Sequence, residues 1–62
     1  MSIDIYVQID CVRRELAMRR RLYPKLIASE RMNATQAEAE LKAMTAVLQT
    51  LESISAPELP MP

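Results

Sequence analysis

The chain has 62 residues, half of them hydrophobic, so it forms at most one domain and is too apolar to stay disordered. Its eight basic and eight acidic residues cancel at pH 7, which argues against a histone-like protein or a mimic of a polyanion. It contains no Gly, which disfavours sheet-rich folds with tight turns and excludes glycine loops that cradle phosphates.

The first predicted element is a helix that begins between Asp4 and Ile9 and ends near Ser29. Its apolar residues recur at alternating steps of four and three, as on one face of a helix. One position of this line has no apolar residue and is occupied by Arg19. This line consists of Ile5, Ile9, Val12, Leu16, Tyr23 and Leu26. A second apolar line beside it consists of Val7, Cys11, Met18 and Leu22. We expect Cys11 to be a small buried hydrophobe, the alternative being a reactive or cross-linking thiol.

The beginning of this helix also fits a β-strand. Between Ile3 and Ile9, β-branched and polar residues alternate strictly, which is typical of a strand. We favour a helix because the helical period continues to Leu26. A strand would instead match the strand–helix–helix order of ribbon-helix-helix repressors, whose paired strands enter the major groove. Asp4 and Asp10 on its polar edge would repel phosphates.

Pro24 lies inside the predicted helix, where it removes a backbone hydrogen bond and its ring clashes with the carbonyl of Arg20. We expect the helix to kink here, because Tyr23 is a poor cap for a new helix. A helix that restarts with Pro24 in its first turn is the alternative. The Tyr23 ring is interpreted as half-buried at the kink, and a recognition knob for a partner is the functional alternative.

A turn is predicted over residues 30–35, followed by a second helix from about Ala34 to Ser53. Two helix caps compete at its beginning, one formed by Asn33 with Gln36 and the other by Thr35 with Glu38. The apolar seam of this helix consists of Ala37, Leu41, Met44, Leu48 and Leu51, flanked by Val47 and Ile54.

The sequence therefore predicts an all-α fold: a helical hairpin over residues 1–55, with its first helix kinked at Pro24, and an extended Pro-rich tail over residues 56–62. Both helices carry more apolar surface than a hairpin can bury. Without a disulfide or a metal, self-association is the remaining way to cover it. A two-fold homodimer that forms a four-helix bundle is the simplest arrangement. The predicted core and dimer residues are Ile9, Val12, Leu16, Leu41, Met44, Leu48 and Leu51.

Catalytic chemistry has few residues to draw on. The chain has no His and a single Cys, so His-dependent nucleophiles are absent and a structural zinc ion lacks ligands. Carboxylate pairs such as Glu38 with Glu40 are typical of a solvated helix surface. We predict no enzymatic activity, no cofactor, no metal and no small-molecule substrate. The first basic residue is Arg13 and no apolar run is long enough for a bilayer, so we expect no signal peptide, no membrane span and a cytoplasmic location.

The strongest local feature is a basic cluster in the first helix that consists of Arg13, Arg14, Arg19, Arg20, Arg21 and Lys25. Residues 1–32 hold seven basic and four acidic residues, net +3, and residues 33–62 hold one and four, net −3. A hairpin lays these halves side by side, so much of their electric field cancels within one chain. The cluster is interpreted as a solvated face, as a patch for an acidic protein surface, or as a phosphate-binding surface. The candidate partner-binding residues are Arg13, Arg14, Arg20, Arg21, Tyr23 and Lys25.

Four segments carry a resemblance to a known group of proteins: Cys11 to Arg19, Tyr23-Pro24, Arg31-Met32 and Ala37 to Met44. Together they cover about half of the chain, and the pattern resembles small phage and prophage proteins that have no assigned activity. Members of that group often carry Gly where this chain has Glu30, so the first helix must end without an easy left-handed residue. The resemblance implies an accessory phage gene, and such genes commonly encode proteins that bind and disable a host enzyme, regulator or defence system.

These patterns favour a small phage-type accessory protein that acts as a homodimer in the bacterial cytoplasm. We predict that it binds and modulates or inhibits a host or phage protein stoichiometrically. One alternative is a nucleic-acid-binding regulator, either ribbon-helix-helix-like or purely helical. Another is a structural subunit of a larger assembly, whose other chains cover the apolar surface.

Overall fold

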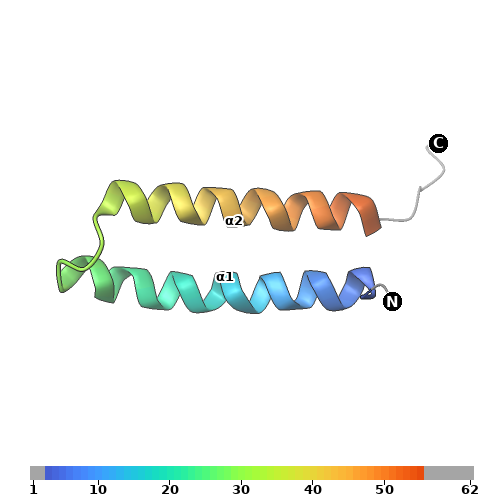
Figure 1. Cartoon of the computed structure of the whole chain (residues 1–62), viewed down its shortest axis with the longest axis horizontal. Coiled ribbons are helices and arrows are strands. Elements are labelled where there is room, and N and C mark those ends of the chain that lie inside the picture. The colour runs from blue at the N-terminus through green and yellow to red at the C-terminus, as the bar shows by residue number, and fades with distance from the viewer. Residues whose placement is uncertain (1–2, 56–62) are drawn as a thin grey trace, which may run out of the picture.

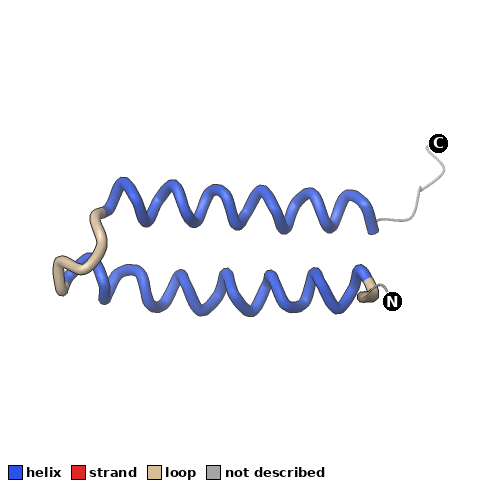
Figure 2. The backbone as a smooth tube through the Cα atoms, viewed as in Figure 1, coloured by secondary structure: helices blue, strands red, loops and turns tan. Residues whose placement is uncertain are grey.

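A computed structural model describes residues 3–55, which form two antiparallel helices joined by a short turn (Figure 1). Helix α1 spans Ile5–Ala28 and helix α2 spans Ala34–Ser55. The tube in Figure 2 is helical on both sides of the turn, and residues 3–55 contain no strand. The prediction of an all-α helical hairpin is confirmed. The tail predicted over residues 56–62 lies outside the described residues.

Helix α1 begins at Ile5 because Asp4 caps it. The backbone N–H of Tyr6 donates a hydrogen bond to the Asp4 carboxylate over 2.7 Å, which satisfies one of the donors that have no partner within the first turn. The first residues of the chain's apolar pattern are therefore helical, and the alternative of a strand up to Ile9 is wrong. The ribbon-helix-helix arrangement loses the strand that it requires.

Helix α1 continues through Pro24 to Ala28 without interruption. No new helix begins at Pro24, so that alternative is wrong. The missing N–H of Pro24 leaves one gap in the hydrogen-bond ladder of α1, and the kink that we expect there stays a prediction.

The turn depends on a left-handed residue that is not glycine. Glu30 has φ of 62°, and its backbone N–H donates to the carbonyl of Ile27 over 3.0 Å, while that of Arg31 donates to Leu26 over 2.9 Å. These two bonds form a Schellman motif, which closes the end of a helix. A residue with a Cβ atom pays about 1–2 kcal/mol for the left-handed conformation.

We expect Glu30→Gly to raise the free energy of unfolding by about 0.5–1 kcal/mol. Relief of the left-handed strain exceeds the extra conformational freedom that Gly adds to the unfolded chain, about 0.4–1 kcal/mol. Urea unfolding followed by helical circular dichroism measures this difference. Ser29→Gly is the control, because Ser29 has φ of −89° and gains nothing from Gly. A Glu30→Gly variant that is no more stable than the parent chain would contradict the claim that Glu30 is strained in the left-handed conformation.

Helix α2 begins after Asn33, which decides between the two predicted caps. The Asn33 side-chain oxygen accepts a hydrogen bond from the backbone N–H of Gln36 over 2.6 Å, and its carbonyl accepts from Ala37 over 3.0 Å. Thr35 already lies inside the helix. The cap that pairs Asn33 with Gln36 is the one that forms.

The core between the helices is thin. Among the described residues only Ile9, Leu16 and Ala37 are buried, and no side chain falls below 2% exposure. The other residues predicted for the core are half-buried along the same seam: Val12, Leu41, Met44, Leu48 and Leu51.

The second apolar line of α1 lies outside the buried seam with α2. Val7, Met18 and Leu22 are exposed, and so is Cys11. The prediction of a buried Cys11 is therefore wrong for the single chain. A helix turns by about 100° per residue, so Cys11 points about 100° away from Val12 on the seam and stays exposed at its edge.

Candidate partner-binding site

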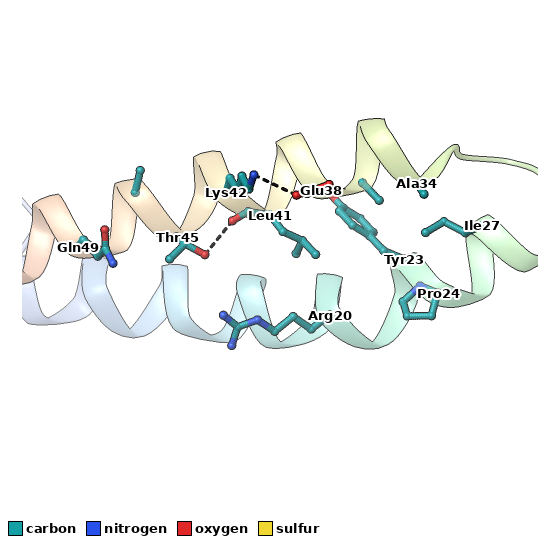
Figure 3. A pocket seen from close by; sticks show the side chains of 12 residues that line it. Arg20, Tyr23, Pro24, Ile27, Ala34, Glu38, Leu41, Lys42, Thr45 and Gln49 are labelled. Atoms are coloured by element: carbon teal, nitrogen blue, oxygen red, sulfur yellow. Dashed lines mark hydrogen bonds and ion pairs between the residues drawn. The ribbon is translucent and has the colours of Figure 1, made fainter.

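An open groove runs between α1 and α2 near the turn and has a volume of about 580 Å³ (Figure 3). We call it the tyrosine groove. It is lined by Arg20, Tyr23, Pro24 and Ile27 of α1 and by Ala34, Ala37, Glu38, Leu41, Lys42, Thr45, Ala46 and Gln49 of α2.

The helical period places these side chains together. Tyr23 and Ile27 are four residues apart on α1, as are Leu41 and Thr45 on α2, so each pair shares one helix face. Figure 3 shows the Tyr23 ring extending from α1 toward α2, whereas Arg20 lies along α1. Tyr23 is half-buried, as we expect of its ring from the sequence.

Charges surround the apolar floor of the tyrosine groove. Lys42 forms an ion pair with Glu38 over 3.0 Å, and both side chains are more than half exposed, so the pair adds little stability. Arg20 is exposed and has no ion pair among the described residues. The groove therefore offers one aromatic ring, one guanidinium without an acidic partner in residues 3–55, and a short apolar floor.

The structure divides the predicted basic cluster between different surfaces. Of its members, Arg20 shares the tyrosine groove with Tyr23, whereas Arg21 and Lys25 lie in a separate shallow depression beside Met18 and Leu22. Successive residues such as Arg20 and Arg21 are about 100° apart on a helix, which explains the division.

Two other arginines of the cluster are engaged in ion pairs. Arg13 pairs with Glu52 of α2 over 2.6 Å, and Arg14 lies 3.7 Å from Asp10 of its own helix. The Arg13 pair links the two helices near the open end of the hairpin. The six candidate partner-binding residues thus do not line one groove: Arg20 and Tyr23 share the tyrosine groove, and Arg21 and Lys25 share the depression beside Met18.

Arg19 occupies the gap in the apolar seam and reaches acidic side chains of both helices. Its Nε donates to Glu15 over 3.0 Å, and its Nη1 lies 3.6 Å from Glu40 of α2. The side chain is 23% exposed, so its apolar stem fills the seam while the charge reaches the carboxylates. The hydrogen bond to Glu15 raises the pKa of Arg19, and partial burial opposes this. The spacing of Glu15 and Arg19 was visible in the sequence, but the link to Glu40 was not.

A second groove, with a volume of about 430 Å³, also spans both helices. We call it the apolar groove. It is lined by Ile3, Val7, Gln8, Cys11, Val12, Val47 and Leu51. Gln8 is its single polar side chain. Ile3 is 66% exposed and Val7 56%, so much of this apolar surface faces solvent.

The apolar groove extends the apolar surface of α2 beyond its seam. Val47 and Ile54 are seven residues apart, so they share a helix face, and they are 47% and 68% exposed. Sequence reasoning identified both residues as flanking the seam. It did not find that Val47 shares a groove with Val7 and Cys11 of α1, because that requires the positions of both helices.

Comparison with known protein families, curated proteins and solved structures found no match. Neither helix of residues 3–55 contains a stretch that is apolar and long enough to traverse a lipid bilayer. Within the same residues, no three Cys, Asp or Glu side chains lie close enough together to hold a metal ion.

Proposed function

We propose that the protein acts by stoichiometric binding to another protein and not by catalysis, and that its active form is a homodimer. In this form two hairpins, each with α1 bent at Pro24, pack into a four-helix bundle. The observation that carries the proposal is the apolar surface that the hairpin leaves open. Seven large hydrophobic side chains are exposed among the described residues, while three residues are buried.

The magnitudes favour self-association. Full burial of one large aliphatic side chain is worth about 1.5–3 kcal/mol, so covering even part of these seven contributes several kcal/mol. A chain of this length has a total stability of only about 3–9 kcal/mol. Covering the open apolar surface is therefore comparable to the whole stability of the fold.

The tyrosine groove is the proposed surface for the other protein. Arg20 and Tyr23 lie together there, and both residue types are favoured anchors of protein interfaces. A guanidinium binds carboxylates with two parallel hydrogen bonds, so the partner should present an acidic side chain beside an apolar one. The resemblance to phage proteins supports a host protein of the infected bacterium as this partner, with inhibition of an enzyme, regulator or defence system as the outcome.

Sedimentation equilibrium at micromolar concentration tests the homodimer. We expect about twice the chain mass of 7.1 kDa. A folded monomer would overturn the proposal, and a chain that stays insoluble unless other chains are present would support a structural subunit instead.

The partner surface is tested by capture from lysate of the producing cell with a tagged protein. We expect Arg20→Glu to lose the captured protein and to remain dimeric. Arg31→Glu is the matched control, because it makes the same charge change in the turn and outside the tyrosine groove. Equal capture by both variants would exclude this groove. Binding to mixed DNA that falls steeply with salt would favour the nucleic-acid alternative.

A further inference from the structure

We infer that the second copy of the chain docks on the apolar groove, with the two-fold axis parallel to the helices. In this arrangement α1 of each copy lies antiparallel on α2 of the other, and both turns are at the same end of the bundle. The inference rests on the homodimer proposed above and specifies its interface.

The composition of the two grooves decides which of them the second copy covers. The apolar groove has Gln8 as its single polar side chain. The tyrosine groove is bordered by Arg20, Glu38 and Lys42, and a second copy placed there would bring all three charges of each chain out of water. Desolvation of charges is costly even when they find partners, whereas burial of apolar surface is favourable.

The distribution of residues along the hairpin decides the direction of the axis. The ion pairs Arg13–Glu52 and Arg19–Glu40 show which parts of the helices are level. The end near Glu52 carries the apolar groove, and the end near Glu40 carries Arg21 and Lys25 beside Met18 and Leu22.

An axis parallel to the helices places each end of one copy on the same end of the other. Apolar surface then meets apolar surface, and Arg21 of the basic helix lies at the level of Glu40 of the second copy's acidic helix. A perpendicular axis would place α1 on α1 and bring Arg21 and Lys25 onto Val7 of the other copy. The first arrangement pairs charges and the second desolvates them.

The size of this face fits a stable dimer. The 24 residues of α1 span about 36 Å at 1.5 Å per residue, and two helices side by side are about 20 Å wide. The face is therefore roughly 700 Å² in flat projection. This is of the same order as the ~800 Å² of accessible surface that each partner buries in a standard protein interface.

The first test compares two adjacent residues of α2. Val47 lines the apolar groove and Ala46 the tyrosine groove, so Val47→Glu and Ala46→Glu place the same charge on different faces. We expect Val47→Glu to raise the dissociation constant of the dimer by about 100-fold or more, because two-fold symmetry buries the charge twice. Ala46→Glu should sediment like the parent.

The outcomes separate the two proposals. If both variants remain dimers, the interface is elsewhere and this inference is wrong, while the homodimer stands. If the parent chain is a folded monomer, the proposed homodimer itself fails.

The second test uses the native thiol and does not depend on the folding of a weakened dimer. Thr50 is exposed and lies between Val47 and Leu51, level with Cys11. In Thr50→Cys, mild oxidation should join Cys11 of one copy to the thiol at position 50 of the other, giving a covalent dimer on a non-reducing gel. A perpendicular axis would keep these positions apart, beyond the ~7 Å between Cα atoms that a disulfide tolerates.

Gln49→Cys is the matched control, because Gln49 lines the tyrosine groove and faces away from the proposed interface. We expect little covalent dimer from it, and none from Thr50→Cys combined with Cys11→Ser. The proposed arrangement is overturned if the Thr50 variant still forms the covalent dimer without Cys11. It is also overturned if the Gln49 variant forms as much covalent dimer as the Thr50 variant.

Discussion

Leu16→Ala is expected to lower the free energy of unfolding by about 2–5 kcal/mol, the range for removing a buried leucine side chain. Leu16 is 3% exposed and is one of three buried residues in the described chain. A protein of this length has about 3–9 kcal/mol of stability, so a single substitution removes a large share of it. In thermal unfolding followed by circular dichroism, the midpoint should fall by about 10 °C or more.

The control for this prediction is the same substitution on the second apolar line. Leu22 is 40% exposed in the single chain, so Leu22→Ala removes the same atoms from a site outside the seam between α1 and α2. We expect it to cost less than Leu16→Ala, because only contacts with the proposed second copy are lost. Similar losses for both variants would show that the seam along Leu16 is not the principal core.

Pro24→Ala is expected to raise the free energy of unfolding by about 2 kcal/mol. Pro is about 3 kcal/mol less favourable than Ala inside a helix, and Pro24 lies four residues before the end of α1. Pro also restricts the unfolded chain, an effect that favours Pro by about 0.4–1 kcal/mol. The helical term is the larger, so the variant should be more stable in urea unfolding.

Pro24→Gly separates the effect of Pro on the helix from its effect on the unfolded chain. It also removes the ring, but Gly costs about 1 kcal/mol relative to Ala in a helix and adds freedom to the unfolded chain, so its gain should be much smaller. Pro24 lines the tyrosine groove, and loss of its ring and of the kink proposed there should weaken binding of the proposed partner without affecting the dimer. A loss of stability in Pro24→Ala would show that packing of the ring outweighs its effect on the helix.

The sequence by itself determined the two helices and the apolar lines along them. Steps of three and four between apolar residues identify one face of a helix, and this period correctly included Ile5 and Ile9 although their alternation also fitted a strand. The sequence also offered Asn33 and Thr35 as competing caps of the second helix, because short polar side chains satisfy the free N–H groups of a first turn, and the structure selected Asn33. All of these signals act over a few residues.

Only the tertiary structure decided which apolar line of α1 faces the other helix. Both lines have helical spacing, and the placement of α2 by the left-handed turn at Glu30 selects the line with Leu16 and leaves Cys11 exposed. The same placement engages Arg13 with Glu52 and leaves Arg20 in a groove. Local periodicity defines the faces of a helix, but contacts between residues distant in the chain depend on how the turn orients the two helices.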